Sequence, residues 1–308
     1  MIKYNYNVKL CTNNIFQEED NVMSEKILIA SDSTSDLSAE LIEKYGIKIL
    51  PLGVTLGDKT FTDGVDIDPD MIYANYEKTG QLPKTAAVNI ADFEDFLEEQ
   101  TNAGYSVVLF TISSEMSSTY HNAQLAAETF ENVYVVDARN LSTGGGLLVL
   151  TAAEMAEKGC GAEEIYNECT RLTEYVDASF VIDSLEFLHK GGRCSALAAL
   201  GANLLQLKPC IVVKDGKMGV SKKYRGKFGG VLSQYISDRM GDASDICLDK
   251  VFVTHAGCDQ EIIDMCVAKV KEIAPEANVM ITRAGCTVSS HCGRNTLGVL
   301  FIRKNPLQ

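Results

Sequence analysis

The sequence has no run of eighteen or more uncharged apolar residues, so we expect no segment of it to span a membrane as a helix. It is also short of positive charge, because 28 lysines and arginines are outnumbered by 42 aspartates and glutamates. The net charge of −14 would repel nucleic-acid phosphates and an anionic membrane surface. We therefore predict no nucleic-acid partner and at most transient membrane contact.

Common catalytic signatures are missing as well. The chain has no Gly-x-x-x-x-Gly-Lys-Ser/Thr phosphate loop, no Gly-x-Gly-x-x-Gly turn after its first predicted strand and no Gly-x-Ser-x-Gly nucleophile elbow. It also lacks Cys-x-x-Cys, His-Glu-x-x-His and any Cys/His quartet with zinc spacing. Kinase, dehydrogenase and common hydrolase functions are therefore disfavoured, and we predict neither a cofactor nor a metal.

The N-terminal segment does not resemble a secretion signal, since residues 1–22 are polar and have no apolar core. The segment Met23-Ser24-Glu25-Lys26 directly precedes the first predicted strand and reads like a natural start, so residues 1–25 are predicted to be a disordered or non-native leader. Ten cysteines in a chain of this size, without an export signal, point to a reducing, cytoplasmic location. They are expected to be small buried residues.

With 308 residues, 46% of them hydrophobic, the chain can form two domains. In the first, short apolar runs alternate with helical patterns; strands are predicted at 27–30, 107–112 and 133–137, and helices at 89–100 and 143–158. In the second, strands are predicted at 180–182, 210–213, 218–221, 251–254, 279–282 and 296–302, and a helix at 259–273. The pattern predicts a mainly parallel α/β domain over 26–175 and a mixed α+β domain over 176–308, with a ligand cleft between them.

Two polar segments have alternative interpretations. Hydroxyl residues fill 111–123, where a buried strand gives way to a helix, and they could either cap the helix or bind an anionic ligand. Residues 63–70 carry alternating carboxylates but lack the glycine and the distal glutamate of a calcium loop. We interpret this acidic segment as a solvated turn rather than a metal site.

Six motifs occur in an order that resembles the DegV family of bacterial fatty-acid-binding proteins, over about residues 27–304. They are Asp32-Ser33-Thr34-Ser35-Asp36-Leu37, Pro51-Leu52, Asp63-Gly64-Val65-Asp66-Ile67, Lys84-Thr85, Gly191-Gly192-Arg193, and Ser290-His291-Cys292-Gly293 before Leu297-Gly298. The resemblance implies a two-domain fold with a lipid cavity between or beside the domains. It also implies that Thr85 and Ser117 bind the carboxylate of a fatty acid.

This chain departs from the family pattern around both residues. Ala86 stands where the family has a serine, so only its backbone N–H could contribute, and Ser118 replaces a glycine and could either crowd the loop or restore the lost hydroxyl. A lone histidine near a strand is usually structural, but the resemblance places His291 in the polar network at the carboxylate. Arg294 and the residue after it replace a Pro-Gly pair and add a charge near the entrance.

Arg193 and Arg225 occupy positions where the family carries arginines, and His255 ends a predicted strand and could join them. A planar guanidinium fits carboxylate and phosphate equally well. The three residues could form a platform facing a partner or a phosphate, and the alternative for each arginine is an ordinary surface ion pair.

These observations predict a non-catalytic cytoplasmic carrier that encloses a C14 to C18 fatty acid such as palmitate. The resemblance implies a fatty acid kinase as partner, with the acyl-phosphate remaining bound for fatty acid metabolism or phospholipid synthesis. The alternative is a hydrolase of acyl esters or acyl-phosphates with Ser117 as nucleophile and His291 as base. A third possibility is a domain that binds a sugar phosphate or a nucleotide.

Overall fold

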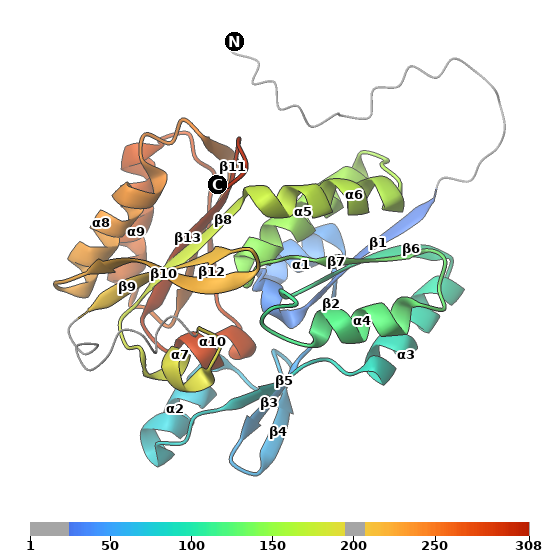
Figure 1. The fold of residues 1–308 in the computed structure, drawn as a ribbon, viewed down its shortest axis with the longest axis horizontal. Coiled ribbons are helices and arrows are strands. Elements are labelled where there is room, and N and C mark those ends of the chain that lie inside the picture. The colour runs from blue at the N-terminus through green and yellow to red at the C-terminus, as the bar shows by residue number, and fades with distance from the viewer. Residues whose placement is uncertain (1–24, 195–206, 308) are drawn as a thin grey trace.

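The computed structural model describes residues 25–194 and 207–307, whose strands form three β-sheets (Figure 1). The predicted leader lies outside these residues except for Glu25, whose carboxylate accepts a hydrogen bond of 3.1 Å from the backbone N–H of Ala162. No helix in the described part of the chain is long and apolar enough to cross a bilayer.

The strands are β1 (Lys26–Asp32), β2 (Lys48–Leu50), β3 (Gly53–Leu56), β4 (Lys59–Thr62), β5 (Lys84–Ala86), β6 (Tyr105–Thr111), β7 (Val133–Asp137), β8 (Val176–Ile182), β9 (Lys208–Lys214), β10 (Lys217–Tyr224), β11 (Ile246–Ala256), β12 (Val279–Arg283) and β13 (Thr296–Arg303). The helices are α1 (Ala39–Tyr45), α2 (Pro69–Thr79), α3 (Ile90–Asn102), α4 (Thr119–Ala127), α5 (Thr143–Glu157), α6 (Ala162–Leu172), α7 (Glu186–Gly191), α8 (Phe228–Met240), α9 (Gln260–Ile273) and α10 (Cys286–Cys292). Short 3₁₀ turns occur at η1 (Ser33–Ser35) and η2 (Thr173–Tyr175).

The first sheet is parallel, with the order β2-β1-β6-β7, which confirms the predicted parallel α/β arrangement. Its strands are apolar because helices cover both faces of the sheet. Helix α3 begins after Asn89, whose side chain accepts a hydrogen bond of 2.9 Å from the N–H of Asp92, as expected for the predicted cap. Phe93 and Leu97 of α3 are fully buried, in agreement with the predicted apolar face.

The second sheet is mixed and has the order β10-β9-β8-β13-β11-β12. Strands β11 and β12 pair in parallel and the other neighbours pair antiparallel, which confirms a mixed C-terminal sheet. The predicted hairpin turns at Asp215 and Gly216, with φ of 52° and 79°, the backbone that a tight two-residue turn requires. Helices α8 and α9 lie side by side along this sheet (Figure 1).

A third, small sheet, with the order β4-β3-β5, was not predicted. Its strands have three or four residues and are largely half-buried or exposed, so they carry no clear alternation of apolar and polar side chains. This sheet holds Thr85 on β5 and thereby positions a candidate ligand-binding residue.

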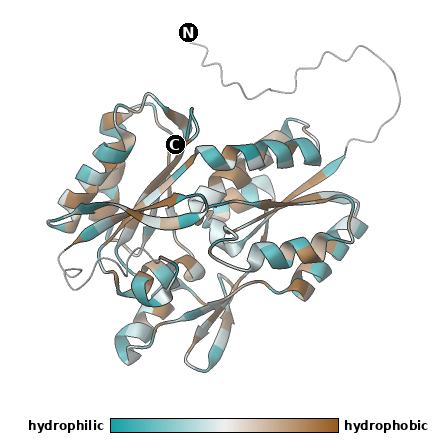
Figure 2. Ribbon diagram, viewed as in Figure 1, coloured by the Kyte–Doolittle hydropathy of each residue, from teal (hydrophilic) through white to brown (hydrophobic). Residues whose placement is uncertain are grey.

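Helix α5 packs against both larger sheets and joins their cores. It is mostly apolar except for two glutamates near its C-terminus, and eleven of its residues are buried. A side chain at Gly146 would place its Cβ 2.7 Å from the carbonyl oxygen of Ser35, so glycine is needed for this close approach. The strands of both larger sheets are mainly hydrophobic, while the outer helices alternate between hydrophilic and hydrophobic faces (Figure 2). The division into two domains at residue 175 stays a prediction.

The cysteines follow the burial expected of them. Eight of the nine described cysteines are buried and Cys258 is half-buried. Burial raises the pKa of the thiol groups of Cys258 and Cys266 to about 12, so both are protonated at neutral pH.

Candidate functional site

An apolar cavity of about 240 Å³ lies between the two larger sheets and is closed on one side by α10. Its walls are formed mostly by aliphatic and aromatic side chains from β8, β9, β10, β13 and the loops that follow β6 and β7. These side chains are Ile112, Met116, Leu141, Ala178, Phe180, Val213, Met218 and Leu300. Such a wall suits a long apolar ligand.

The residue pairing along β13 shows in which direction the cavity extends. Along β13, Thr296 pairs with Ala256, Gly298 pairs with Thr254 and Phe180, and Leu300 pairs with Ala178. All of these residues line the cavity. Thr296 also donates a hydrogen bond of 3.0 Å to the last residue of α10, so this end lies next to His291. The distance from Thr296 to Leu300 is about 13 Å along the strand. The cavity therefore extends from a polar end at α10 to an apolar end at Leu300.

Thr85 and His291 meet at the polar end. The Thr85 hydroxyl and Nε2 of His291 are 2.9 Å apart, although 206 residues separate them in the chain. Ser117 and Ser118 line the same cavity from the loop between β6 and α4. Four of the five residues predicted to bind a carboxylate therefore line one cavity, and two of them are in contact. The fifth, Ala86, is exposed and does not line the cavity; its neighbour Ala87 does.

The His291 imidazole is held neutral. Its burial, together with the positive charge of Arg193, lowers its pKa to about 4. Nδ1 has no hydrogen-bond partner among the described residues and faces Gly191, where an added Cβ would lie 2.7 Å from it. A neutral imidazole carries one N–H, so the ring either donates to Thr85 or accepts from it. With a hydroxyl beside it, the ring can hydrogen-bond a carboxylate without adding a charge.

The serines at the start of α4 act partly as caps. Ser118 occupies the N-cap position without a side-chain hydrogen bond to the helix. Instead, the Ser117 hydroxyl accepts from the N–H of Thr119 at 3.2 Å and lies 2.8 Å from the Thr119 hydroxyl. The capping interpretation therefore holds in part, because Ser117 satisfies a backbone N–H, and ligand binding by Ser117, which lines the cavity, stays a prediction.

Arg193 and His255 line the cavity, whereas Arg225 does not. The exposed Arg193 donates from Nη1 to the carbonyl of Gly191 at 2.8 Å. Burial, followed by the charge of Arg283, lowers the pKa of His255. Arg225 is exposed just after the end of β10, so the predicted platform is divided between the cavity and the outer surface.

Arg294, which was expected to add a charge near the entrance, instead forms ion pairs away from the cavity. Its guanidinium lies 3.8 Å from Asp70 and 3.7 Å from Glu77, and it does not line the cavity. Asn295, the next residue, has a φ of 57°, a left-handed conformation that asparagine tolerates and that the glycine of the family pattern would also allow. The loop thus keeps a backbone shape typical of glycine.

A buried carboxylate cluster beside the cavity corrects one prediction. The acidic segment was interpreted as a solvated turn, but Asp63 is only 4% exposed. It accepts hydrogen bonds from the N–H groups of Cys286 and Thr287, at 2.8 and 3.0 Å, and from the Thr287 hydroxyl at 2.6 Å. The prediction holds for Asp66, Asp68 and Asp70, which are exposed, and is wrong for Asp63, because a carboxylate can be buried when a helix N-terminus supplies donors. Among the residues described, no cluster could hold a metal ion.

Asp36 and Asp32 complete this cluster. Asp36 accepts from the N–H of Gly285 at 2.8 Å and is hydrogen-bonded to the Ser142 hydroxyl. Burial raises the pKa of Asp36 to about 8 and that of Asp32 to about 6, with the other carboxylates of the cluster adding to both shifts. Asp36 is therefore largely protonated at neutral pH. Sequence reasoning missed the cluster because Asp63 lies in a different motif from Asp32 and Asp36, and only the packing of the chain brings the two motifs together.

The fold and the cavity define an α/β protein with two large sheets and an apolar ligand chamber that is polar at one end. The family model described as "Uncharacterised protein, DegV family" matches residues 26–304, and the chain belongs to this family. A DegV domain-containing protein of Clostridium acetobutylicum is 34% identical over 284 residues, which cover 91% of this chain and 99% of the relative.

Solved structures resemble this chain over nearly its whole length. The structure of a DegV family protein from Thermus thermophilus, described as fatty acid binding, has a TM-score of 0.82 and 27% identity and covers 90% of this chain and 99% of its own. A stearic acid-binding protein from Eubacterium ventriosum has a TM-score of 0.76 and 28% identity, with 90% and 98% coverage.

Proposed function

We propose that this protein is a cytoplasmic carrier that binds a C14 to C18 fatty acid and presents its carboxylate to a fatty acid kinase. The observation that carries the proposal is the Thr85–His291 pair, 2.9 Å apart, at the polar end of an apolar cavity. The fatty-acid-binding relatives from Thermus thermophilus and Eubacterium ventriosum support it.

The energetics favour a long acyl chain. Each buried methylene contributes about 0.8 kcal/mol, so a chain that fills the cavity accounts for most of the affinity. The headgroup site adds specificity, because a buried carboxylate must be hydrogen-bonded or take up a proton. Neutral His291, the Thr85 hydroxyl and Ser117 can provide those hydrogen bonds.

The geometry offers less support for the hydrolase alternative. A serine nucleophile needs a base within hydrogen-bonding reach and a third group that orients the base. Here the Ser117 hydroxyl is hydrogen-bonded to Thr119, and His291 is hydrogen-bonded to Thr85. Nδ1 of His291 has no orienting acid among the described residues. The carrier therefore fits the arrangement better.

The first test is binding itself. We expect native mass spectrometry of the purified protein to reveal a bound C14 to C18 fatty acid, and stripped protein to take up palmitate.

Thr85→Ala and Ser117→Ala should each weaken palmitate binding by about 1 to 3 kcal/mol, the usual cost of leaving a buried charged group short of one partner. Ala86→Ser is the matched control, since the exposed Ala86 lies outside the cavity and the change should leave affinity unaltered. Repeatedly empty protein that takes up no palmitate would refute the proposal, and turnover of activated esters would favour the hydrolase.

The second test addresses presentation to the kinase. Arg193→Ala and Arg225→Ala should leave most palmitate binding intact, because the acyl chain supplies most of the affinity. Acyl-phosphate formation with a bacterial fatty acid kinase should nevertheless fall in both variants. If palmitate binding falls together with acyl-phosphate formation, the arginines bind the headgroup directly. If neither quantity changes, the arginines form only ordinary surface ion pairs.

A further inference from the structure

Helix α10 carries His291, yet it has only seven residues and its own cap is Gly285, which provides no side chain. A helix this short is not stable by itself, so its position depends on tertiary contacts. The contacts at its N-terminus come from Asp63 and Asp36, more than 220 residues earlier in the chain.

Asp63 also contacts the segment that leads to Thr85. Its backbone N–H donates to the carbonyl of Leu52 at 2.9 Å, and its carboxylate accepts from the Ser33 hydroxyl at 3.0 Å. The Ser33 oxygen in turn accepts from the N–H of Leu52 at 3.1 Å. Leu52 directly precedes β3, and β3 pairs with β5, on which Thr85 pairs with Val54.

One carboxylate therefore connects both halves of the Thr85–His291 pair. We propose that Asp63 is a positioning residue of the headgroup site, which sets the register of α10 against the small sheet and thereby the distance between Thr85 and His291. Asp63 does not line the cavity, so it acts on the ligand only through these two elements. This inference rests on the proposed function and names a further residue on which the carboxylate site depends.

Asp63 and Asp36 differ in what surrounds them, and this difference provides a matched control. A backbone N–H, which can only donate, faces each oxygen of the Asp63 carboxylate, from Cys286 at Oδ1 and from Thr287 at Oδ2, and the hydroxyls of Ser33 and Thr287 also donate to it. An asparagine there would direct its NH₂ group at one of these two N–H groups in either orientation of its amide. Asp36 faces one N–H and the Ser142 hydroxyl, which can accept a hydrogen bond. An asparagine at position 36 would keep both hydrogen bonds.

The experiment compares palmitate with hexadecanol, which has the same chain length and no carboxylate. The wild-type protein should prefer palmitate, and Asp63→Asn should reduce that preference by about tenfold or more, while hexadecanol affinity changes by less than about threefold. Asp36→Asn should keep the preference. In a Thr85→Ala background, Asp63→Asn should alter the preference by less than about threefold, because the two changes act on the same contact.

The outcomes of this experiment distinguish failure of the inference from failure of the proposed function. Equal losses for palmitate and hexadecanol in Asp63→Asn, or losses that add to those of Thr85→Ala, would overturn the inference and leave Asp63 a general packing residue. Wild-type protein that binds neither ligand would overturn the proposed function and this inference with it. If the wild type prefers palmitate and Asp63→Asn keeps that preference, the inference alone is overturned.

A milder variant covers the case in which Asp63→Asn does not fold. Ser33→Ala removes one of the four donors to Asp63 and the acceptor for Leu52, and it should lower the preference for palmitate by about threefold. An unchanged preference in folded Ser33→Ala protein would then overturn the inference.

Discussion

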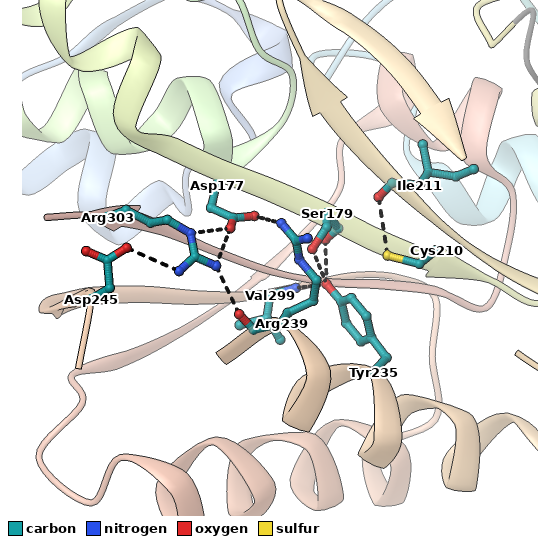
Figure 3. A network of polar contacts seen from close by, with 9 residues as sticks. All are labelled: Asp177, Ser179, Cys210, Ile211, Tyr235, Arg239, Asp245, Val299 and Arg303. Carbon is teal, nitrogen blue, oxygen red and sulfur yellow. Dashed lines mark hydrogen bonds and ion pairs between the residues drawn. The ribbon is translucent and has the colours of Figure 1, made fainter. Parts of the chain in front are cut away.

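Replacement of Asp177 by alanine is expected to lower the free energy of unfolding by about 3 to 5 kcal/mol, the cost of breaking a buried ion pair by removing one partner. Asp177 lies on β8 with its side chain 1% exposed, between the guanidinium groups of Arg239 and Arg303 (Figure 3). Nε of Arg303 donates to it at 2.7 Å, and Arg239 forms a second hydrogen bond. Without the carboxylate, two largely buried positive charges would face each other.

Urea unfolding measures this effect, and Asp245→Ala is the matched control. Asp245 contacts the same Arg303, but at 3.5 Å and with its side chain 35% exposed. Its removal should cost less than about 1 kcal/mol, because solvent screens an exposed pair. Equal losses in the two variants would contradict the view that Asp177 is the centre of this network.

Leu300→Trp is expected to weaken palmitate binding by about 100-fold and to leave decanoate binding within about threefold of the wild type. Leu300 lies at the apolar end of the cavity and is 3% exposed. An indole there would fill the deep end and displace about four methylenes, worth about 3 kcal/mol. The shorter ligand would still reach the headgroup site.

The chain contains no tryptophan, so the introduced indole would be the single tryptophan of the variant, and its emission would report directly on occupancy of the deep end. Leu300→Met, which conserves volume, is the control and should bind both ligands like the wild type. A similar loss for palmitate and decanoate would mean that the acyl chain does not extend toward Leu300.

Elements with a strong local pattern were predicted well. Strand β7 occupies the predicted residues, Val133–Asp137, because its apolar run is bounded by polar residues. The β9–β10 hairpin follows from Asp215 and Gly216, which adopt the positive φ that the turn needs. The small sheet and α10 were missed, since neither has enough residues to form a periodic pattern.

Part of the headgroup site could also be predicted from the sequence. Hydroxyls at the end of a buried strand indicate either a cap or a ligand site, and Ser117 serves the first role while facing the cavity. The family resemblance added Thr85 and His291. It could not distinguish Ala86, which faces outward, from Ala87, which lines the cavity, because that depends on how β5 pairs with β3.

The sequence by itself determined the class of fold, the acidic character and the hydroxyls available for a ligand, because composition and periodicity are local properties of the chain. Only the tertiary structure decided that Thr85 meets His291, 206 residues away, and that Asp63 is buried under α10. Those contacts depend on how separate elements pack. The burial of a carboxylate, and the low pKa of His291, follow from which donors and apolar groups the packing brings beside them.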